Sequence, residues 1–372
     1  MTKFLQFGTS RFLQAHADLF IGEALGENQI TVVHSSGNAT TLSRLDALQD
    51  KAGFPVIVKG LEDGQPVERL HKVCAVKLAL STTNDWDSVL DAGEHCEFII
   101  SNVSEKGYDP HITDSGVDFH PDNSFPATLL HLLSHRFAVG GRPLTIMPLE
   151  LFESNGHHLK KLVFKLARDR HTSPELLEWL DRCIWVNSLV DRIVSETIEP
   201  AGAVAEPYAL WAIENAHGLE FPLKHQSIKI VDDLRPYQYL KLYILNLSHT
   251  YMASKWRRAV SSGQLPEDFK VRDYIERPDL LDDLLHVLEC EVLPGFRASG
   301  LLEEATAYVS ETIDRFRNPN LNHFLSDIFV GHNQKVKSRI NGFLAWAKAS
   351  GDHDLKPCLA NLVEIELENL TW

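Results

Sequence analysis

Short apolar runs alternate with stretches of helical spacing through the N-terminal half of the chain. These runs are KFLQF (3–7), ITVVHSS (30–36), EFIISNV (97–103) and PLTIMPLE (143–150). All four indicate strands, and the continuous apolar character of 97–103 and 143–150 is typical of buried strands in a parallel sheet. Gly8 ends the first run, and apolar residues then recur at helical intervals from Phe12 to Leu25. Strand, turn, helix and strand in this order predict the opening of a dinucleotide-binding α/β domain.

Two further segments in this half favour a hairpin. PVIVKGL (55–61) and RLHKVCAVKLAL (69–80) flank the turn EDGQ. Residues 127–137 have helical spacing, and IWVNSLVDRIV (184–194) begins as another extended stretch.

The pattern changes near residue 228, where IKIVDD leads through Arg235-Pro236 into a long apolar helix. Amphipathic stretches with short polar breaks follow at 271–290, 300–316, 321–329 and 333–348. We therefore predict a Rossmann-like α/β domain over residues 1–223 and a mostly α-helical domain over residues 224–372, with a boundary good to about ten residues.

Length and charge narrow the classes of function. The 372 residues suffice for two domains, and the formal net charge is −15. An acidic surface repels phosphate backbones, which argues against a nucleic-acid partner. No apolar run approaches the roughly 20 residues that cross a bilayer. The start, MTKFLQFGTSRF, lacks a basic and apolar leader pattern. We expect a cytoplasmic protein without a membrane partner, monomeric or a small homo-oligomer.

The cysteines and histidines do not have the spacing of a metal site. The five cysteines are scattered and odd in number, which argues against a disulfide framework. A single pair of the eighteen histidines, His131 and His135, has H-x3-H spacing, which alone does not supply the four ligands of a structural metal site, and no C-x2-C pair is present. We therefore expect chemistry that does not depend on a metal.

Three polar residues interrupt the long apolar segment YQYLKLYILNLSHTYMA (237–253). Asn246 and His249 are three residues apart and so are neighbours on a helix. Lys241 precedes His249 by eight residues, which separates them by roughly 80° around an α-helix. Burying these polar groups among leucines is costly unless they find partners, which a polar substrate can supply. The alternative is a hydrogen-bonded patch at a domain boundary.

The pattern K-x4-N-x2-H resembles the catalytic signature of the polyol-specific long-chain dehydrogenases, the mannitol dehydrogenase family. Further segments resemble the altronate oxidoreductase (tagaturonate reductase) branch of that family. They are ELFESNG (150–156), NSLVDRIV (187–194), KIVDDLRPYQYLK (229–241) and DRFRNPNLNH (314–323). The resemblance runs in order through nearly the whole chain.

The resemblance implies roles for the three polar residues. Lys241 would be the general acid/base. Asn246 would donate a hydrogen bond to the reacting carbonyl oxygen, and His249 would orient the substrate hydroxyl or the lysine.

The same resemblance implies substrate-binding residues. Arg315 would hold a sugar-acid carboxylate in a bidentate way, with His323 as a second candidate. Asn155, in the matched Asn-Gly pair of ELFESNG, is also expected to bind substrate.

The first turn departs from the cofactor-binding pattern of the family. Of the pattern G-x-G-x-F-x-R-A-H, the chain keeps Gly8, Phe12, Ala15 and His16. Ser10 replaces the second glycine, and Gln14 replaces the arginine. We expect Gly8, Ser10 and Phe12 to contact the cofactor, since a small hydroxyl at a helix start can still bind phosphate.

Two other loops are candidates for cofactor binding. The second strand ends in His34, Ser35 and Ser36, with no carboxylate for a ribose hydroxyl and Arg44 further on. This composition is compatible with NADP, whereas the resembling branch is associated with NAD, which we favour. In SNVSEKGY (101–108), Asn102 and Glu105 are candidates, although an ordinary capped loop is the alternative.

Two substitutions favour a sugar acid over mannitol. Leu151 and Gln238 stand where mannitol dehydrogenases have an asparagine and a glutamate. The leading hypothesis is an NAD(P)-dependent oxidoreductase that interconverts an aldonate and its keto form, such as altronate and tagaturonate. The alternatives are a dehydrogenase of a neutral polyol or sugar phosphate, and a non-catalytic dinucleotide-binding sensor.

Overall fold

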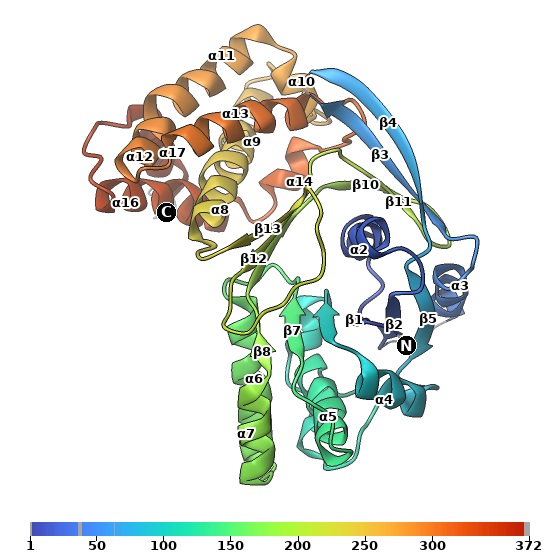
Figure 1. Cartoon of the computed structure of the whole chain (residues 1–372). Helices are drawn as coiled ribbons and strands as arrows, with labels where there is room; N and C mark the ends of the chain where they lie inside the picture. The colour runs from blue at the N-terminus through green and yellow to red at the C-terminus, as the bar shows by residue number, and fades with distance from the viewer. Residues whose placement is uncertain (1, 36–38, 63, 368–372) are drawn as a thin grey trace. The chain divides into compact units, whose positions relative to one another are not determined.

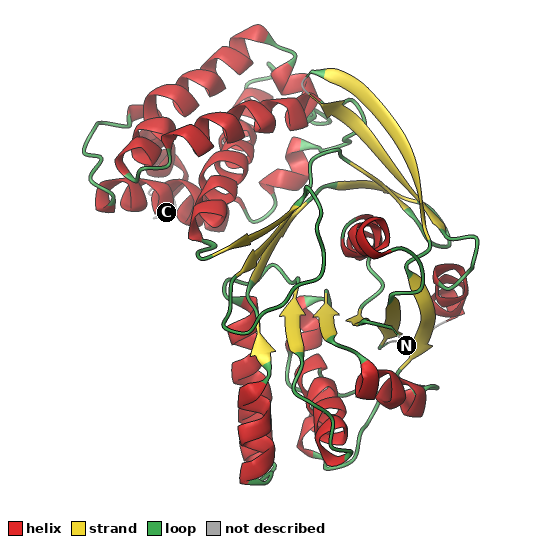
Figure 2. Ribbon diagram, viewed as in Figure 1, coloured by secondary structure: helices red, strands yellow, loops and turns green. Residues whose placement is uncertain are grey.

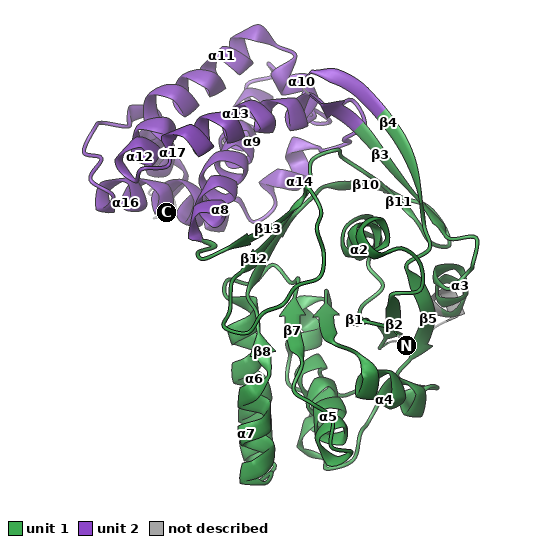
Figure 3. Ribbon diagram, viewed as in Figure 1, with its two compact units in different colours: residues 1–59, 68–234 green, residues 60–67, 235–372 purple. Residues whose placement is uncertain are grey.

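The computed structural model describes residues 2–35, 39–62 and 64–367. It divides into two compact units (Figure 3). The first comprises residues 1–59 and 68–234, and the second residues 60–67 and 235–372. The change of unit after Leu234 lies eleven residues beyond the predicted boundary after residue 223. The short segment 60–67 groups with the second unit, which the sequence pattern does not indicate.

The first unit is built on a six-stranded sheet in the order β5-β2-β1-β6-β7-β8 (Figure 1). Its strands are β1 (Phe4–Phe7), β2 (Ile30–His34), β5 (Val76–Ser81), β6 (Phe98–Ser101), β7 (Thr145–Pro148) and β8 (Ile184–Trp185). All neighbouring pairs are parallel. Numbered by their order in the chain, the strands run 3-2-1-4-5-6, which is the Rossmann order. The predicted fold class is confirmed.

Both faces of this sheet are covered, as the continuous apolar strands predict. Phe4 of β1 packs on one face with α2 (Ala17–Leu25), whereas Leu5 and Phe7 pack on the other. The helices on the second face are α4 (Trp86–His95), α5 (Phe125–Ala138), α6 (Asn155–Asp169) and α7 (Pro174–Arg182) (Figure 2). Successive side chains of β1 point to opposite faces of the sheet, so this strand contributes to two separate apolar cores.

The first unit also carries two smaller sheets. One has the order β10-β11-β3-β4, from β10 (Val194–Thr197), β11 (Ala203–Ala205), β3 (Phe54–Glu62) and β4 (Gln65–Val73). The other has the order β13-β12-β9, from β13 (Ile228–Val231), β12 (Leu210–Glu214) and β9 (Ser188–Asp191). The remaining helices of the unit are α1 (Arg11–Ala15) and α3 (Ala39–Leu48), with short 3-10 turns η1 (Glu105–Tyr108) and η2 (Ile112–Ser115).

The predicted hairpin is only partly correct. Its second arm, expected as one strand over 69–80, breaks after Val73, and β5 begins at Val76 in the parallel sheet. The carbonyl of Cys74 accepts a hydrogen bond from the Asn28 backbone N–H (3.1 Å), and that of Ala75 accepts from Gln29 (2.7 Å). The turn before β2 thus holds residues 74 and 75 and directs the following residues into the parallel sheet. Strand propensity does not encode this long-range contact.

The described part of the second unit beyond residue 235 is helical, as predicted. Its helices are α8 (Arg235–Leu240), α9 (Leu247–Ser261), α10 (Val271–Ile275), α11 (Pro278–Val287), α12 (Leu293–Ala298), α13 (Leu302–Arg317), α14 (Leu325–Phe329), α15 (His332–Lys335), α16 (Gly342–Ala349) and α17 (Pro357–Leu367). Three π-helical segments interrupt them: η3 (Lys241–Asn246), η4 (Leu288–Val292) and η5 (Val336–Asn341). Among the described residues, no helix is both long and apolar enough to span a bilayer.

Asp18 is a buried carboxyl inside the first unit. It lies in the first turn of α2, is 0% exposed, and neither of its oxygens has a hydrogen-bond partner of good geometry. Burial raises the pKa of Asp18 to about 7, and the amide of Gln6 offsets only part of that rise. The carboxyl is therefore neutral in the folded protein at mildly acidic pH.

This burial predicts a pH-dependent stability. Between about pH 4 and pH 7 the folded chain keeps a proton that the unfolded chain has lost, so stability falls as pH rises through that window. Asp18→Asn should therefore exceed the parent in unfolding free energy by about 1–4 kcal/mol at pH 8 and match it near pH 4. Urea unfolding at both pH values measures this, with the exposed Asp109→Asn as control. Equal effects at both pH values would contradict the assignment.

Candidate active site

The turn after β1 accepts only glycine. Gly8 has φ +112°, and a Cβ at this position would lie 2.6 Å from the backbone oxygen of Asn102. The Gly8 N–H donates to the carbonyl of Val33 (2.9 Å), and the Asn102 N–H donates to that of Phe7 (3.0 Å). The carboxyl ends of β1, β2 and β6 are thereby drawn together, where the Rossmann fold binds dinucleotides.

Ser10 and Asn102, both predicted from sequence, form one hydrogen-bonded chain. Ser10 is the N-cap of α1, where its Oγ accepts from the Leu13 N–H (3.2 Å). The same hydroxyl donates to Asn102 Oδ1 (2.9 Å), and Asn102 Nδ2 donates to the Leu149 carbonyl (2.9 Å). The hydroxyl that replaces the second glycine thus links the loops after β1, β6 and β7.

Gln14 takes a structural position where the family pattern has an arginine. It is fully buried, and its Nε2 donates to the Thr9 carbonyl (3.1 Å). Its Oε1 accepts from the Gly202 N–H (2.6 Å) and from Arg11 (3.2 Å). A neutral amide can serve donors and acceptors at once, which explains how the turn stays ordered without the arginine.

Phe12 and His16 pack together beside this turn. The half-buried ring of Phe12 stacks on His16 with centroids 4.8 Å apart. His16 Nε2 donates to the Leu210 carbonyl (2.9 Å), and burial lowers the pKa of His16 to about 3. His16 is therefore a neutral packing residue.

The end of β2 has a histidine where an NAD-specific fold has an acid. His34 Nδ1 lies 3.1 Å from the Thr9 hydroxyl. Burial, assisted by the charge of Arg44, lowers the pKa of His34. Ser35 is exposed, and Ser36 lies outside the described residues.

The loop after β6 is hydrogen-bonded to an acid that sequence reasoning missed. The predicted Glu105 is exposed at the start of η1. The buried Glu150, just after β7, accepts from Ser101 Oγ (3.1 Å) and from the Val103 N–H (3.0 Å), and burial raises the pKa of Glu150. The sequence feature that could have indicated Glu150 is its position directly after the apolar run 143–149.

Asn155 anchors the start of α6. It is 1% exposed, and its Nδ2 donates to the carbonyls of Pro148 (3.0 Å) and Ser188 (3.0 Å). Its Oδ1 accepts from the backbone N–H groups of Gly156 and Ser188, both at 2.9 Å. These bonds tie the end of β7 to β9, and a contact with substrate stays a prediction.

The helix with Lys241 and Asn246 is not the regular α-helix that the spacing predicts. Residues Lys241–Asn246 form a π-helical turn, in which the Leu247 N–H donates to the carbonyl of Leu242, five residues earlier. In a regular α-helix, Lys241 and Asn246 would be separated by roughly 140° around the axis. One turn of a π-helix contains about one residue more than one turn of an α-helix. Residues five apart in a π-turn therefore lie closer to a common face of the helix.

His249 lies in α9, in contact with the end of α13 and with the segment that follows it. Its side chain is buried, with ring centroids 4.8 Å from Phe316 and 4.9 Å from His323. Burial lowers the pKa of the half-buried His323. The structure thus brings together two residues that the sequence places seventy-four positions apart (323 minus 249).

Arg315 belongs to α13, one residue before the Phe316 ring that contacts His249. It is 4% exposed, and its Nη1 lies 3.4 Å from the Tyr308 hydroxyl. A buried guanidinium next to the Lys241–Asn246–His249 helix is compatible with recognition of an anionic group.

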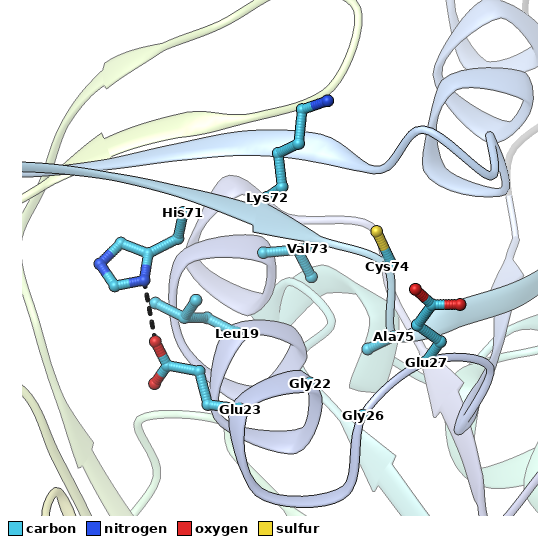
Figure 4. A pocket seen from close by; sticks show the side chains of 10 residues that line it. All are labelled: Leu19, Gly22, Glu23, Gly26, Glu27, His71, Lys72, Val73, Cys74 and Ala75. Atoms are coloured by element: carbon cyan, nitrogen blue, oxygen red, sulfur yellow. Dashed lines mark ion pairs between the residues drawn. The ribbon is translucent and has the colours of Figure 1, made fainter.

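A separate hollow of about 210 Å³ lies between α2 and β4 (Figure 4). At its edge Glu23 pairs with His71 (2.8 Å) and accepts from His225 Nε2 (2.8 Å), which lowers the pKa of Glu23. It is not at the carboxyl ends of the parallel strands, so we do not assign the cofactor to it. Within the described ranges, no cluster of three or more histidine, cysteine or acidic residues is arranged to hold a metal ion.

Comparison with known proteins agrees with this geometry. The profile described as the mannitol dehydrogenase Rossmann domain matches residues 2–225. Altronate oxidoreductase of Bacillus subtilis (strain 168) is 29% identical over 367 residues, covering 91% of this chain and 73% of the relative. Altronate oxidoreductase of Escherichia coli O1:K1 is 29% identical over 385 residues, covering 94% and 76%.

Two solved structures share the fold. Pseudomonas fluorescens mannitol 2-dehydrogenase, in a ternary complex with NAD and D-mannitol, has a TM-score of 0.69 at 18% identity, covering 99% of this chain and 79% of that one. A substrate-free D-sorbitol dehydrogenase has a TM-score of 0.72 at 19% identity, covering 94% and 79%. The profile match extends over more than half of the chain, and the chain therefore belongs to the mannitol dehydrogenase family, whose members here are oxidoreductases acting on CH–OH groups.

Proposed function

We propose that this protein is an NAD-dependent oxidoreductase that interconverts an aldonate and its keto form, such as altronate and tagaturonate. The observation that carries the proposal is the helix with Lys241, Asn246 and His249, in which residues Lys241–Asn246 form a π-helical turn. Support for the sugar-acid class comes from the relatives named altronate oxidoreductase.

The residues of the first unit fit a nicotinamide dinucleotide. Gly8 turns the chain at the end of β1, where a Cβ would collide with the Asn102 carbonyl, and Ser10 places a hydroxyl at the start of α1. Gly8 and Ser10 would bind the pyrophosphate, with Phe12, Asn102 and Glu105 near it. When bound, the cofactor accepts or delivers a hydride. We favour NAD because the relative with a bound cofactor holds NAD.

NADP is the alternative cofactor. An NAD-specific fold has a carboxylate at the end of β2, and this carboxylate would repel the 2′-phosphate of NADP. Here the position is occupied by His34, on which the charge of Arg44 acts. In the sequence, Ser35 and Ser36 follow His34 and carry hydroxyls. A comparison of NADH and NADPH in the same assay separates the two cofactors.

Lys241 would transfer the proton at the reacting oxygen. As a neutral amine it accepts the hydroxyl proton during oxidation, and as an ammonium it returns that proton during reduction. The amide of Asn246 would donate to the same oxygen, where negative charge develops. His249 would orient the substrate hydroxyl, and Arg315, with His323 and Asn155 as further candidates, would bind the rest of the sugar acid.

Two other functions remain as alternatives. A neutral polyol is the substrate class of the structural relative that holds D-mannitol. A sugar phosphate belongs to the same alternative, since the acid/base residues would be the same. A non-catalytic dinucleotide sensor would have no use for the three polar residues of the buried helix.

The experiment that tests the proposal follows NADH and NADPH oxidation by absorbance with ketouronates, neutral ketoses and ketose phosphates. We expect turnover with NADH and one ketouronate. Turnover only with neutral or phosphorylated ketoses would move the substrate to the polyol class. Tight NADH binding without turnover on any substrate would favour the sensor.

Removal of the amine at Lys241 should abolish turnover. General acid–base catalysis contributes about 10²–10⁴-fold, so we expect Lys241→Ala to lower kcat by at least about 100-fold. NADH affinity, measured by fluorescence titration, should stay within about threefold because the first unit is unchanged. The exposed Lys337→Ala is the matched control. Near-parental turnover in Lys241→Ala would refute the assignment.

Arg315 should discriminate between acidic and neutral substrates. Arg315→Lys keeps the charge but loses the bidentate geometry, so we expect KM for the ketouronate to rise about tenfold or more. KM for any neutral ketose turned over should change little. Arg317→Lys, at a side chain 48% exposed, is the control. An equal rise for both substrate classes would point to a structural role for Arg315.

A further inference from the structure

Two side-chain donors converge on the backbone carbonyl of Asn246, at the end of the π-helical turn. The Thr250 hydroxyl donates to this carbonyl (2.9 Å), four residues back along the helix. Arg339 Nη1 lies 3.2 Å from the same hydroxyl and 3.4 Å from the same carbonyl. Thr250 and Asn246 are therefore connected to each other and to a second helix.

This arrangement fits a cause of the irregular helix. A threonine hydroxyl bonded to the carbonyl four residues earlier tends to bend a helix, and a side chain that enters the backbone ladder does the same. Thr250 is 0% exposed, so its hydroxyl cannot exchange this bond for one to bulk water. The π-turn of η3 ends at the residue whose carbonyl both donors contact.

Arg339 occupies an unusual place for an arginine. It is half-buried in η5, and no acidic side chain in the described residues forms an ion pair with it. Its charge instead contributes to lowering the pKa values of Lys335 and His332, and burial lowers the pKa of Arg339 itself. A half-buried cation whose hydrogen bonds go to one carbonyl and one hydroxyl is costly, which suggests that these contacts have a function.

The contacts act on the backbone of a proposed catalytic residue. The carbonyl of Asn246 is fixed by Thr250 and Arg339, so the backbone that directs the Asn246 amide is fixed as well. Lys241 begins the same π-turn. Release of the carbonyl would let the turn relax toward an α-helix, which rotates Lys241 and Asn246 away from each other.

We propose that Thr250 and Arg339 are positioning residues that hold the π-turn of η3 and thereby set Lys241 and Asn246 on one face. The inference rests on the proposed function for the roles of Lys241 and Asn246. The contacts that define it are independent of the substrate.

The kinetic test compares Thr250→Val, Thr250→Ser and Arg339→Met in the full chain. A misplacement of about 1 Å can cost about 100-fold, so Thr250→Val and Arg339→Met should lower kcat by about 10- to 100-fold. KM for the ketouronate and NADH affinity should stay within about threefold. Thr250→Ser retains the hydroxyl and should recover most of kcat. The double variant should lose little more than the worse single variant, since both act on one carbonyl.

Thr306→Val is the matched control. The Thr306 hydroxyl donates to the carbonyl of Leu302 (2.7 Å) in the same four-residue pattern, at an exposed position of α13. This variant should retain parental kcat. A Thr250→Val enzyme as active as Thr306→Val would overturn the proposal. A rise in ketouronate KM at unchanged kcat in Arg339→Met would also overturn it, because Arg339 would then bind substrate directly.

Hydrogen exchange separates this proposal from the proposed function. Backbone amides of residues 242–247 should exchange at least about tenfold faster in Thr250→Val and Arg339→Met than in the parent, while those of α13 stay unchanged. This readout needs no substrate, so it decides the proposal even if the parent enzyme is inactive on the whole panel. Unchanged exchange at 242–247 in both variants would refute it.

Discussion

The close approach of Gly8 to the backbone of Asn102 is the constraint on which the first unit depends. A side chain at Gly8 would collide with the Asn102 carbonyl at 2.6 Å, so β1 and β6 could not end side by side. The positive φ of Gly8 then turns the chain into α1, whose N-cap hydroxyl returns to Asn102. One residue without a Cβ thus sets both the sheet edge and the helix start that a dinucleotide would meet.

Polar groups on one helix constrain the second unit, as Gly8 constrains the first; His249 is buried, and Lys241 and Asn246 are half-buried. An amine, an amide and an imidazole occupy a helix that is otherwise largely apolar, and a half-buried arginine from another helix reaches its backbone. Such groups are stable only where donors and acceptors match, which restricts the helix to one backbone path. Residues Lys241–Asn246 follow a π-helical path, so the angle around the helix axis between Lys241 and Asn246 depends on the tertiary structure.

Much of the first unit could be predicted from the sequence because its strands are buried on both faces. Continuous apolar runs mark β1, β2, β6 and β7, and the right-handed crossover rule leaves few ways to order them. The interruption between β4 and β5 could not be predicted, since it depends on hydrogen bonds from Asn28 and Gln29. Gln14 is similar: its role depends on Gly202, far away in the chain.

The sequence by itself determined the class of each unit, the glycine turn, and the spacing of Lys241, Asn246 and His249, because these follow from local periodicity and from steric limits on single residues. Only the tertiary structure decided the π-turn, the link from Ser10 to Asn102 and the placement of His323 beside His249. The physical reason is that each depends on a partner from a distant segment. Arg339 lies ninety-three positions from the carbonyl that it contacts, and no periodic pattern records such a pairing.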